Sequence, residues 1–191
     1  MSSVKGTQTE KNLLAAFAGE SQARNRYTLA AKAAAKEGYM QIEAIFLETA
    51  DNERVHAKNF FKFLEGGMVE ITASYPAGVI GTTAENLELG AKGEHEEWET
   101  LYPRSADIAE KEGFPKVASQ FRLVSKVEKE HEARYLKLLE NLKSGKVFKK
   151  DGNVMWLCRK CGYIHIAKEP PKICPVCLEP QGYYEVKAEN Y

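Results

Sequence analysis

The chain has 191 residues, with 27 Lys and Arg residues balanced by 27 Asp and Glu residues, so its formal net charge is zero. That balance argues against a nucleic-acid-binding surface and against a polybasic membrane anchor. Hydrophobic residues make up 43% of the chain, enough for one ordinary domain or one domain with a small module. No apolar run approaches ~20 residues, and the polar start does not resemble an export signal. We therefore expect a cytoplasmic protein without a membrane span.

A first helix is predicted to begin at a capping box formed by Thr7 and Glu10. Apolar residues then recur in steps of three and four, as on the buried face of a helix. One position of this face holds a carboxylate, Glu20, where a core residue is expected. Gly38 is a suitable stop after the last turn.

The second predicted helix runs from Ile42 to about Glu65 and carries two ionisable residues on its apolar face. Glu53 and His56 continue the stripe formed by Ile42, Phe46, Thr49, Phe60 and Phe63. Burying an ionised carboxylate without a partner costs several kcal/mol or more. Glu and His three residues apart lie on one helix face. A metal ion is the partner that best accounts for both.

Residues 68–81 show no clear period and contain Pro76 and two glycines, so they are predicted to form a long connection. A third helix should begin after Thr82, with Glu94 on its apolar face followed by Glu97 or Trp98. Pro103 is expected to kink or interrupt this helix. The fourth helix, after a turn at Gly113, again carries a Glu-x-x-His pair on its apolar face, Glu128 and His131.

The two halves of the helical region repeat one another. Residues 36–39 match residues 111–114 at an offset of 75, and the two Glu-x-x-His pairs match at the same offset. Tyr27 matches Tyr102 at 75, whereas Glu20 matches Glu94 at 74. The second half also carries an additional carboxylate, Glu97, where the first half has Ala23. Two similar helical hairpins are therefore expected to pack face to face.

A single Glu at a core position is usually a boundary residue whose tip reaches water. A set spread over four consecutive helices favours a different interpretation, because Glu-x-x-His from two helices plus Glu from two others is the ligand pattern of di-iron and di-manganese bundles. One long crossover between the second and third helices is typical of the ferritin-like four-helix bundle. The predicted metal ligands are Glu20, Glu53, His56, Glu94, Glu97, Glu128 and His131.

Four cysteines form two Cys-x-x-Cys pairs with twelve residues between them: Cys158, Cys161, Cys174 and Cys177. Four thiolates at this spacing can close a tetrahedral site for structural zinc or for a single redox iron. Residues 1–146 are thus expected to form the bundle, 147–152 a linker, and 153–191 a small metal module. Such a module is too small to fold well without its metal.

The pair of motifs, Cys-x-x-Cys-Gly-Tyr and Cys-Pro-x-Cys, resembles rubredoxin and favours iron over zinc. Combined with the bundle ligands, including the additional Glu97, nearly the whole chain resembles rubrerythrin. The resemblance implies a mainly α fold, a ferritin-like bundle joined to a rubredoxin-like module of strands and loops. It implies two non-haem irons in the bundle and one iron at the cysteines.

The resemblance further implies a peroxidase that reduces hydrogen peroxide to water. Electrons would come from a separate NAD(P)H-dependent reductase or from reduced rubredoxin, and the chain has no Gly-rich dinucleotide loop of its own. By family analogy Glu53 and Glu128 bridge the irons, Glu20 binds one iron, and Glu94 and His131 bind the other. Glu97 and His56 are implied as alternative ligands of the first iron, and their exchange would move that iron on reduction.

Tyr27 and Tyr102 are either plain core aromatics or hydrogen-bond partners of the metal-bound carboxylates. The family also implies a head-to-tail homodimer that brings a partner's cysteine site near each di-iron site. Two rival functions remain: ferroxidase, iron-handling or dioxygen-reducing activity of the bundle, and a non-enzymatic zinc-ribbon adaptor.

Overall fold

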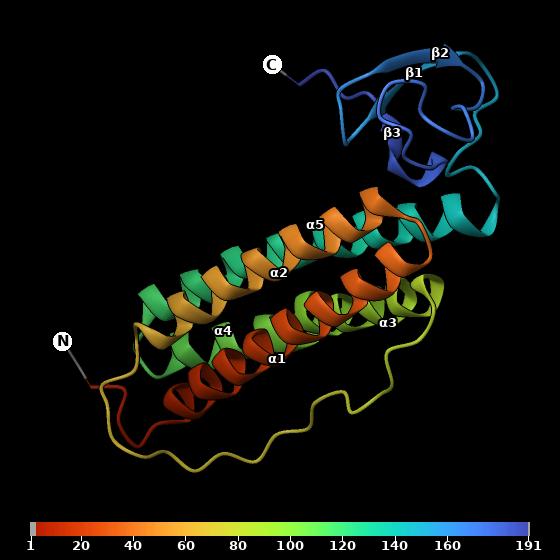
Figure 1. The fold of residues 1–191 in the computed structure, drawn as a ribbon. Helices are drawn as coiled ribbons and strands as arrows, with labels where there is room; N and C mark the ends of the chain where they lie inside the picture. The colour runs from red at the N-terminus through yellow and green to blue at the C-terminus, as the bar shows by residue number, and fades with distance from the viewer. Residues whose placement is uncertain (1–2, 191) are drawn as a thin grey trace.

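The computed structural model describes residues 3–190 and consists of two helical hairpins packed as a bundle, with a small β-sheet module at one end (Figure 1). In the first hairpin α1 packs along α2, and in the second a continuous rod of α3, η1 and α4 packs along α5. Their bounds are α1 Gln8–Lys36, α2 Met40–Phe61, α3 Thr83–Glu96, η1 Glu97–Leu101, α4 Tyr102–Lys111 and α5 Pro115–Lys143. The predicted ferritin-like bundle is confirmed.

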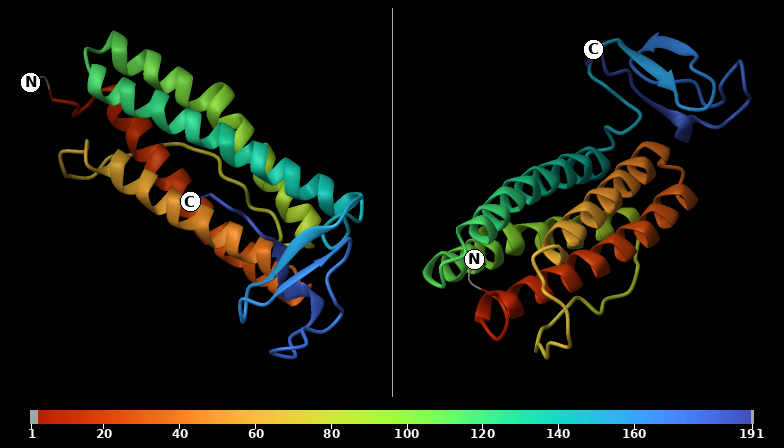
Figure 2. Two further views of the ribbon diagram at one scale, coloured as in Figure 1. Left: turned by 90° about the horizontal axis from the view of Figure 1, so that it is seen from above. Right: turned by 90° about the vertical axis from the view of Figure 1, so that its left-hand side faces the viewer.

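The long crossover between α2 and α3 lies where it was predicted. Residues 64–82 have no regular structure and run along the outside of the bundle, returning the chain to its opposite end (Figures 1 and 2). Helix α2 ends at Phe61, four residues before the predicted stop, so Phe63 lies in the following turn. Among the described residues, no helix has the length and apolar character needed to span a membrane.

Two loop glutamates related by the repeat hold the hairpins together. Glu37, in the α1–α2 turn, accepts a hydrogen bond from the backbone N–H of Thr83 at the start of α3 (2.9 Å). Glu112, in the α4–α5 turn, accepts from the backbone N–H groups of Gln8 (3.1 Å) and Thr9 (2.8 Å) at the start of α1. The first N–H groups of a helix lack intrahelical partners and favour negative charge. Each hairpin thus caps a helix of the other.

The one-residue difference between the repeat offsets has a structural cause. Between α3 and α4 the helix widens into the π-helical segment η1, where the N–H of Tyr102 bonds to the carbonyl of Glu97, five residues back. A π-turn accommodates one more residue than an α-turn, so it absorbs the insertion between Glu94 and Tyr102. Pro103 then occupies the first turn of α4, directly after the π-helical segment. The predicted interruption therefore precedes the proline.

The C-terminal module is a three-stranded antiparallel sheet in the order β2–β1–β3, formed by β1 Val154–Cys158, β2 Ile164–Ala167 and β3 Tyr184–Val186. Its core consists of Trp156 and Tyr184 packed around Cys158 and Cys174, all at most 1% exposed. So small a core supports the expectation that a metal stabilises the module.

The module contacts the bundle at the α1–α2 turn. Phe148 stacks on Tyr39 with ring centroids 6.0 Å apart, and the 3₁₀ turn η2 (Gln181–Tyr183) packs against α2. At the closest point, backbone meets backbone: a Cβ atom on Gly182 would overlap the carbonyl oxygen of Gly38. Glycine at this position permits the close approach.

Replacing Gly182 with Ala should therefore separate the module from the bundle. We expect G182A to cost about 1–3 kcal/mol, the usual penalty of overpacking, and to speed proteolysis in residues 147–152. Limited proteolysis and thermal melting measure both effects. G152A is the matched control, because a Cβ there would meet nothing within 4 Å. Equal behaviour of the two variants would contradict this role of Gly182.

Candidate metal centres

Six of the seven bundle residues predicted as ligands are buried on the inner faces of four helices. Helix α1 contributes Glu20, α3 contributes Glu94, and α2 and α5 each contribute a Glu-x-x-His pair. Their exposed fractions run from 0% to 8%, for Glu20, Glu53, His56, Glu94, Glu128 and His131. Their burial follows from helical periodicity, since these positions continue the apolar stripes of their helices.

The six side chains form two groups, each with its candidate ligand atoms within 4.8 Å of one another. The first cluster is Glu20, Glu53, His56 and Glu128. The second cluster is Glu53, Glu94, Glu128 and His131. Glu53 and Glu128 belong to both, so two carboxylates lie between two adjacent positions suited to a metal ion. Carboxylate and imidazole donors in this number suit first-row transition metals.

The unsatisfied atoms of the clusters test whether metal ions fit. Buried polar atoms normally have a hydrogen-bond partner. Here Glu20 Oε2, Glu53 Oε1, both carboxylate oxygens of Glu128 and His131 Nδ1 have none of suitable geometry among the described residues. Each of the five atoms lies within 3.6 Å of another candidate ligand atom of the clusters. Two cations would satisfy them and offset the carboxylate charge, so the site fits two metal ions.

Both imidazoles face the carboxylates through Nδ1. His56 Nδ1 lies 2.9 Å from Glu53 and 2.9 Å from Glu128, and His131 Nδ1 lies 2.7 Å from Glu128. The far nitrogen of His131 lies 3.2 Å from Asn52 Oδ1. A ring that binds a metal through Nδ1 carries its proton on Nε2, which Asn52 can accept. The sequence pattern did not identify Asn52, because a polar residue beside a motif gives no periodic signal.

The two tyrosines are hydrogen-bond donors to cluster carboxylates rather than plain core aromatics. Tyr27 Oη donates to Glu94 Oε1, and Tyr102 Oη donates to Glu20 Oε1. Each contact joins the two hairpins, because Tyr27 and Glu20 lie on α1 while Glu94 and Tyr102 lie on α3 and α4. Each tyrosine fixes one carboxylate oxygen and leaves the other available to the cluster. Burial raises the pKa of both phenols well above the usual range, so both stay donors.

Glu97 lies apart from both clusters. It is half-buried at the start of η1, and it lines a cavity between the bundle and the crossover. Burial raises the pKa of its carboxyl well above normal, helped by the charges of Glu128 and Glu53. Of the two alternative ligands, His56 belongs to the first cluster, whereas Glu97 lines the cavity.

Without a cation, protons stabilise the clusters. Burial raises the pKa of Glu20 and of Glu94 well above normal. Burial would lower the pKa of His131, but contacts with Glu128 and Glu53 outweigh it and raise that pKa to about 9. Burial likewise opposes the shift at Glu53, whose pKa falls to about 2 because the imidazoles of His131 and His56 lie 3.3 and 2.9 Å from its carboxylate. Large pKa shifts in opposite directions among neighbouring buried groups are typical of functional sites.

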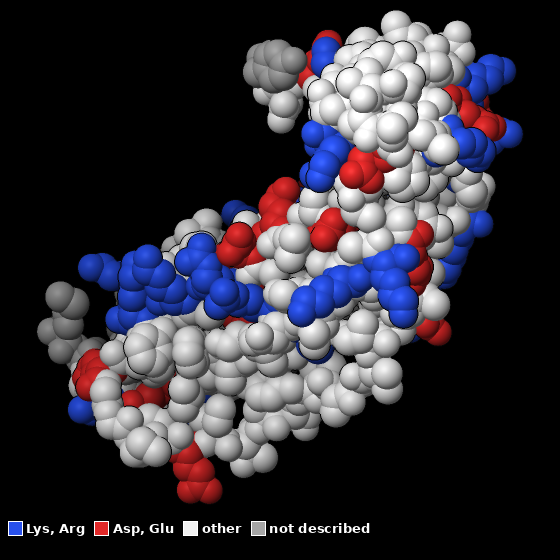
Figure 3. Space-filling view, in the orientation of Figure 1, with Lys and Arg blue, Asp and Glu red and all other residues white. Residues whose placement is uncertain are grey.

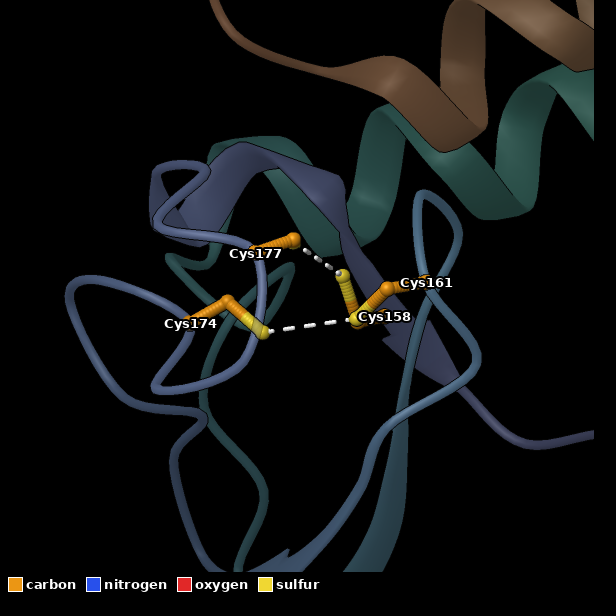
Figure 4. A group of neighbouring side chains, drawn as sticks. All are labelled: Cys158, Cys161, Cys174 and Cys177. Atoms are coloured by element: carbon orange, nitrogen blue, oxygen red, sulfur yellow. Dashed lines mark hydrogen bonds between the residues drawn. The ribbon is translucent and has the colours of Figure 1, made fainter.

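The four cysteines converge at the edge of the module (Figure 4). Sγ atoms of Cys158 and Cys177 lie 3.7 Å apart, as do those of Cys161 and Cys174, and all four thiols are free. A tetrahedral ion with bonds of about 2.3 Å to sulfur would separate the sulfurs by about 3.8 Å. The arrangement therefore fits one tetrahedral ion.

The two cysteine turns are built alike. The amide of the residue four positions after the first cysteine bonds to that cysteine's carbonyl, from Gly162 to Cys158 (2.8 Å) and from Leu178 to Cys174 (3.0 Å). Both residues have a left-handed backbone, with φ of 80° and 65°. Glycine adopts this conformation freely, whereas a leucine is strained there. The strained backbone at Leu178 therefore lowers the stability of the second turn, which holds Cys174 and Cys177 in position.

The metal-free protein should lose stability as pH rises from about 6.5 to 9. In this range folded His131, with its raised pKa, holds a proton that the unfolded chain releases, and the same sign applies to Glu20 and Glu94 above their ordinary range. Metal-loaded protein should melt at higher temperature with a weaker dependence, because the ligands are already deprotonated. Melting curves of both forms check this. In metal-free E20Q the pH dependence should weaken, and an unchanged slope would contradict the assignment.

Comparison with known proteins agrees with this geometry. The family model described as rubrerythrin matches residues 11–139, and that described as the rubrerythrin rubredoxin-like domain matches residues 156–185. A rubrerythrin of Porphyromonas gingivalis is 58% identical, covering 99% of this chain and 94% of the relative. Rubrerythrin-1 of Clostridium acetobutylicum is 59% identical over the full length of both.

Among solved structures, the fully reduced, all-ferrous state of nigerythrin aligns with a TM-score of 0.63 and 32% identity, covering 97% of this chain and 92% of the other. Reduced symerythrin from Cyanophora paradoxa, 24% identical, aligns with a TM-score of 0.63 over 75% of this chain and 89% of its own, which supports the fold. Family, fold and clusters coincide: the chain belongs to the rubrerythrin family, whose members carry a di-iron site and a rubredoxin-like iron site.

Proposed function

We propose that the protein is a peroxidase that reduces hydrogen peroxide to water. Peroxide takes up two electrons and two protons, its O–O bond breaks, and two water molecules form. The observation that carries the proposal is the pair of clusters sharing Glu53 and Glu128, next to a cavity lined by Glu97. Family membership supports an iron-dependent oxidoreductase in general, and Glu97 at the cavity wall could supply the proton that peroxide reduction needs.

We assign the ligands from the clusters. Glu53 and Glu128 would be shared by two irons, with Glu20 and His56 completing the first site and Glu94 and His131 the second. Glu97 would be the alternative to His56 at the first site. When iron is bound, the clusters supply the electrons for O–O cleavage, and the four-cysteine site accepts replacements from an external NAD(P)H-dependent reductase or reduced rubredoxin.

The chain's own residues would hold the proton and orient the ligands. Glu97 lies at the wall of the cavity, and burial raises the pKa of its carboxyl well above normal, which favours the protonated form. From there it can protonate the oxygen that leaves as water, a role worth about 10²–10⁴ in rate for a positioned acid. Tyr27 and Tyr102 keep Glu94 and Glu20 turned toward the clusters.

The separation of the two metal centres supports a dimer. Glu128 lies fifteen residues before the end of α5 at Lys143, about 20 Å along the helix at ~1.5 Å per residue. The four cysteines of the same chain lie in the module that follows the end of α5 (Figure 1). A head-to-tail homodimer would bring a partner's module close to each bundle site. A size measurement tests this and also separates a dimer from the many-subunit cage that iron storage requires.

Anaerobic stopped-flow mixing of the iron-loaded, fully reduced protein with hydrogen peroxide tests the proposed reaction. We expect rapid oxidation in the wild type and at least about tenfold slower oxidation in E97A, because the positioned acid is lost. E99A, altered at an exposed position of the same π segment, is the matched control and should behave as wild type. Oxidation by dioxygen but not by peroxide, or an E97A rate equal to that of E99A, would contradict the proposal.

The four-cysteine site has its own test. In C158S we expect the first oxidation by peroxide to proceed normally, while steady turnover with an external reductase is lost, because reducing equivalents no longer return. Visible absorption identifies the metal, since ferric iron bound by four thiolates is strongly coloured and zinc is colourless. A colourless module in protein isolated from its own cells would favour the zinc-ribbon adaptor over the electron-transfer role.

A further inference from the structure

A cavity of about 630 Å³ lies between the bundle and the crossover, outside the two clusters. Residues 72–76 of the crossover form its outer wall, and α1, α3, η1 and α4 form the inner wall. Binding sites for small molecules commonly have volumes of about 300–1,000 Å³. The cavity is therefore large enough to receive a small organic molecule as well as peroxide itself.

A single side chain, that of Tyr102, connects the inner wall of the cavity to the first cluster. Tyr102 lines the cavity and donates to Glu20, and Gly19, which also lines it, directly precedes Glu20 in α1. Glu97 lies on the same wall. The second cluster faces elsewhere, because His131 lines a separate opening of about 390 Å³ between α2 and α5. A molecule in the larger cavity would thus approach the first cluster.

Tyr75 fixes the crossover over this cavity. Its hydroxyl donates to the carbonyl of Ala15 in α1 (2.7 Å), and its ring lies 3.5 Å from the place where a Cβ of Gly19 would be. The ring therefore packs closely against α1 at Gly19. Farther along the crossover, the backbone of Gly81 makes two hydrogen bonds to the side chain of Asn86 in α3, at 3.1 and 3.0 Å. The crossover is thus held over the cavity by Tyr75 and again, beyond the cavity, where it leads into α3.

The outer wall carries almost no charge. From Ile71 to Thr82 the crossover contains no Lys, Arg, Asp or Glu. In Figure 3 the middle and right of the lower edge, where the crossover runs toward α3, are white, whereas one acidic side chain projects farther left and most charged side chains form a band above. The inner wall carries two arginines and two glutamates, Arg26, Arg104, Glu96 and Glu97, whose formal charges balance. A cavity with one uncharged wall and no net formal charge on the other suits a small, neutral, polar molecule. Hydrogen peroxide and small alkyl hydroperoxides have this chemistry.

We propose that this cavity is the entrance and receiving site for the hydroperoxide substrate, and that Tyr75 sets the size of the molecule admitted. The inference rests on the proposed peroxidase function and deepens it. Because Tyr75 bridges the crossover and α1, its ring narrows the passage toward Glu97. Hydrogen peroxide passes the ring, whereas a bulky aryl hydroperoxide is held back.

Azide binding to the oxidised, iron-loaded protein tests the entrance without catalysis. An obstruction in an entrance slows association and dissociation equally and leaves Kd unchanged, whereas a change at the bound position alters Kd. S105W on α4 and T72W on the crossover fill the cavity from opposite walls. We expect each to slow both rate constants about tenfold. A133W, at the separate opening beside His131, is the matched control and should leave both rates unchanged.

Two substitutions test Tyr75 directly. Y75F removes only the hydrogen bond to Ala15, and should speed hydrogen exchange in residues 72–76 and both azide rate constants. Y75A also removes the ring, and should raise the rate of oxidation by cumene hydroperoxide, relative to hydrogen peroxide, about tenfold. Circular dichroism and melting curves confirm that each variant is folded. T72W, in irregular structure, keeps the test valid if S105W fails to fold.

Several results would overturn the inference: azide rates unchanged in both filled variants, slowing in A133W equal to that in S105W, or an unchanged peroxide preference in Y75A. The proposed function fails separately. If peroxide does not oxidise the reduced wild-type protein, the peroxidase assignment falls while the azide rates still decide whether the cavity is the entrance. If peroxide does oxidise it and the filled variants react at the wild-type rate, the entrance is wrong and the peroxidase assignment stands.

Discussion

The structure depends on the burial of four carboxylates and two imidazoles in the middle of a helical bundle. Each ionised carboxylate loses its water there, at a cost of several kcal/mol that packing alone does not recover. The chain compensates in part with Tyr27 and Tyr102, which donate to one oxygen of Glu94 and of Glu20. The remaining oxygens converge without partners on two adjacent positions. Two metal ions resolve this conflict, and the helices, crossover and loop caps hold the ligands in place for them.

The near-symmetry of the bundle explains both its stability and its one asymmetric feature. Glu37 and Glu112, which are related by the repeat, each cap a helix of the opposite hairpin, so these hydrogen bonds hold the two hairpins together. Symmetry ends at η1, where one inserted residue widens the helix. That segment begins with Glu97, the one predicted ligand that lies outside both clusters. An inserted residue and an additional carboxylate therefore occur at the same place, beside the cavity that leads to the first cluster.

Much of this could be predicted from the sequence, because helical periodicity reveals which positions face inward. Glu53 and His56 interrupt an apolar stripe, and the crossover is marked by Pro76 and its glycines. Other features depend on how the hairpins are rotated against each other, which no local pattern records. Three hydrogen bonds join segments that are distant in the sequence. Tyr27 bonds to Glu94, His131 to Asn52, and Tyr75 to the backbone of α1. The offset of 74 against 75 indicated an insertion, but its form as a π-turn needed the structure.

Metal binding is the reason for the buried charges, and the location of bound iron tests this most directly. Anomalous diffraction at the iron absorption edge, from crystals of the iron-loaded protein, should give two peaks between the inner faces of α1, α2, α3 and α5. Both should lie beside Glu53 and Glu128, with a third peak among the four cysteine sulfurs. A bundle interior without iron, in which the carboxylates are hydrogen-bonded to one another or to water, would contradict the central claim.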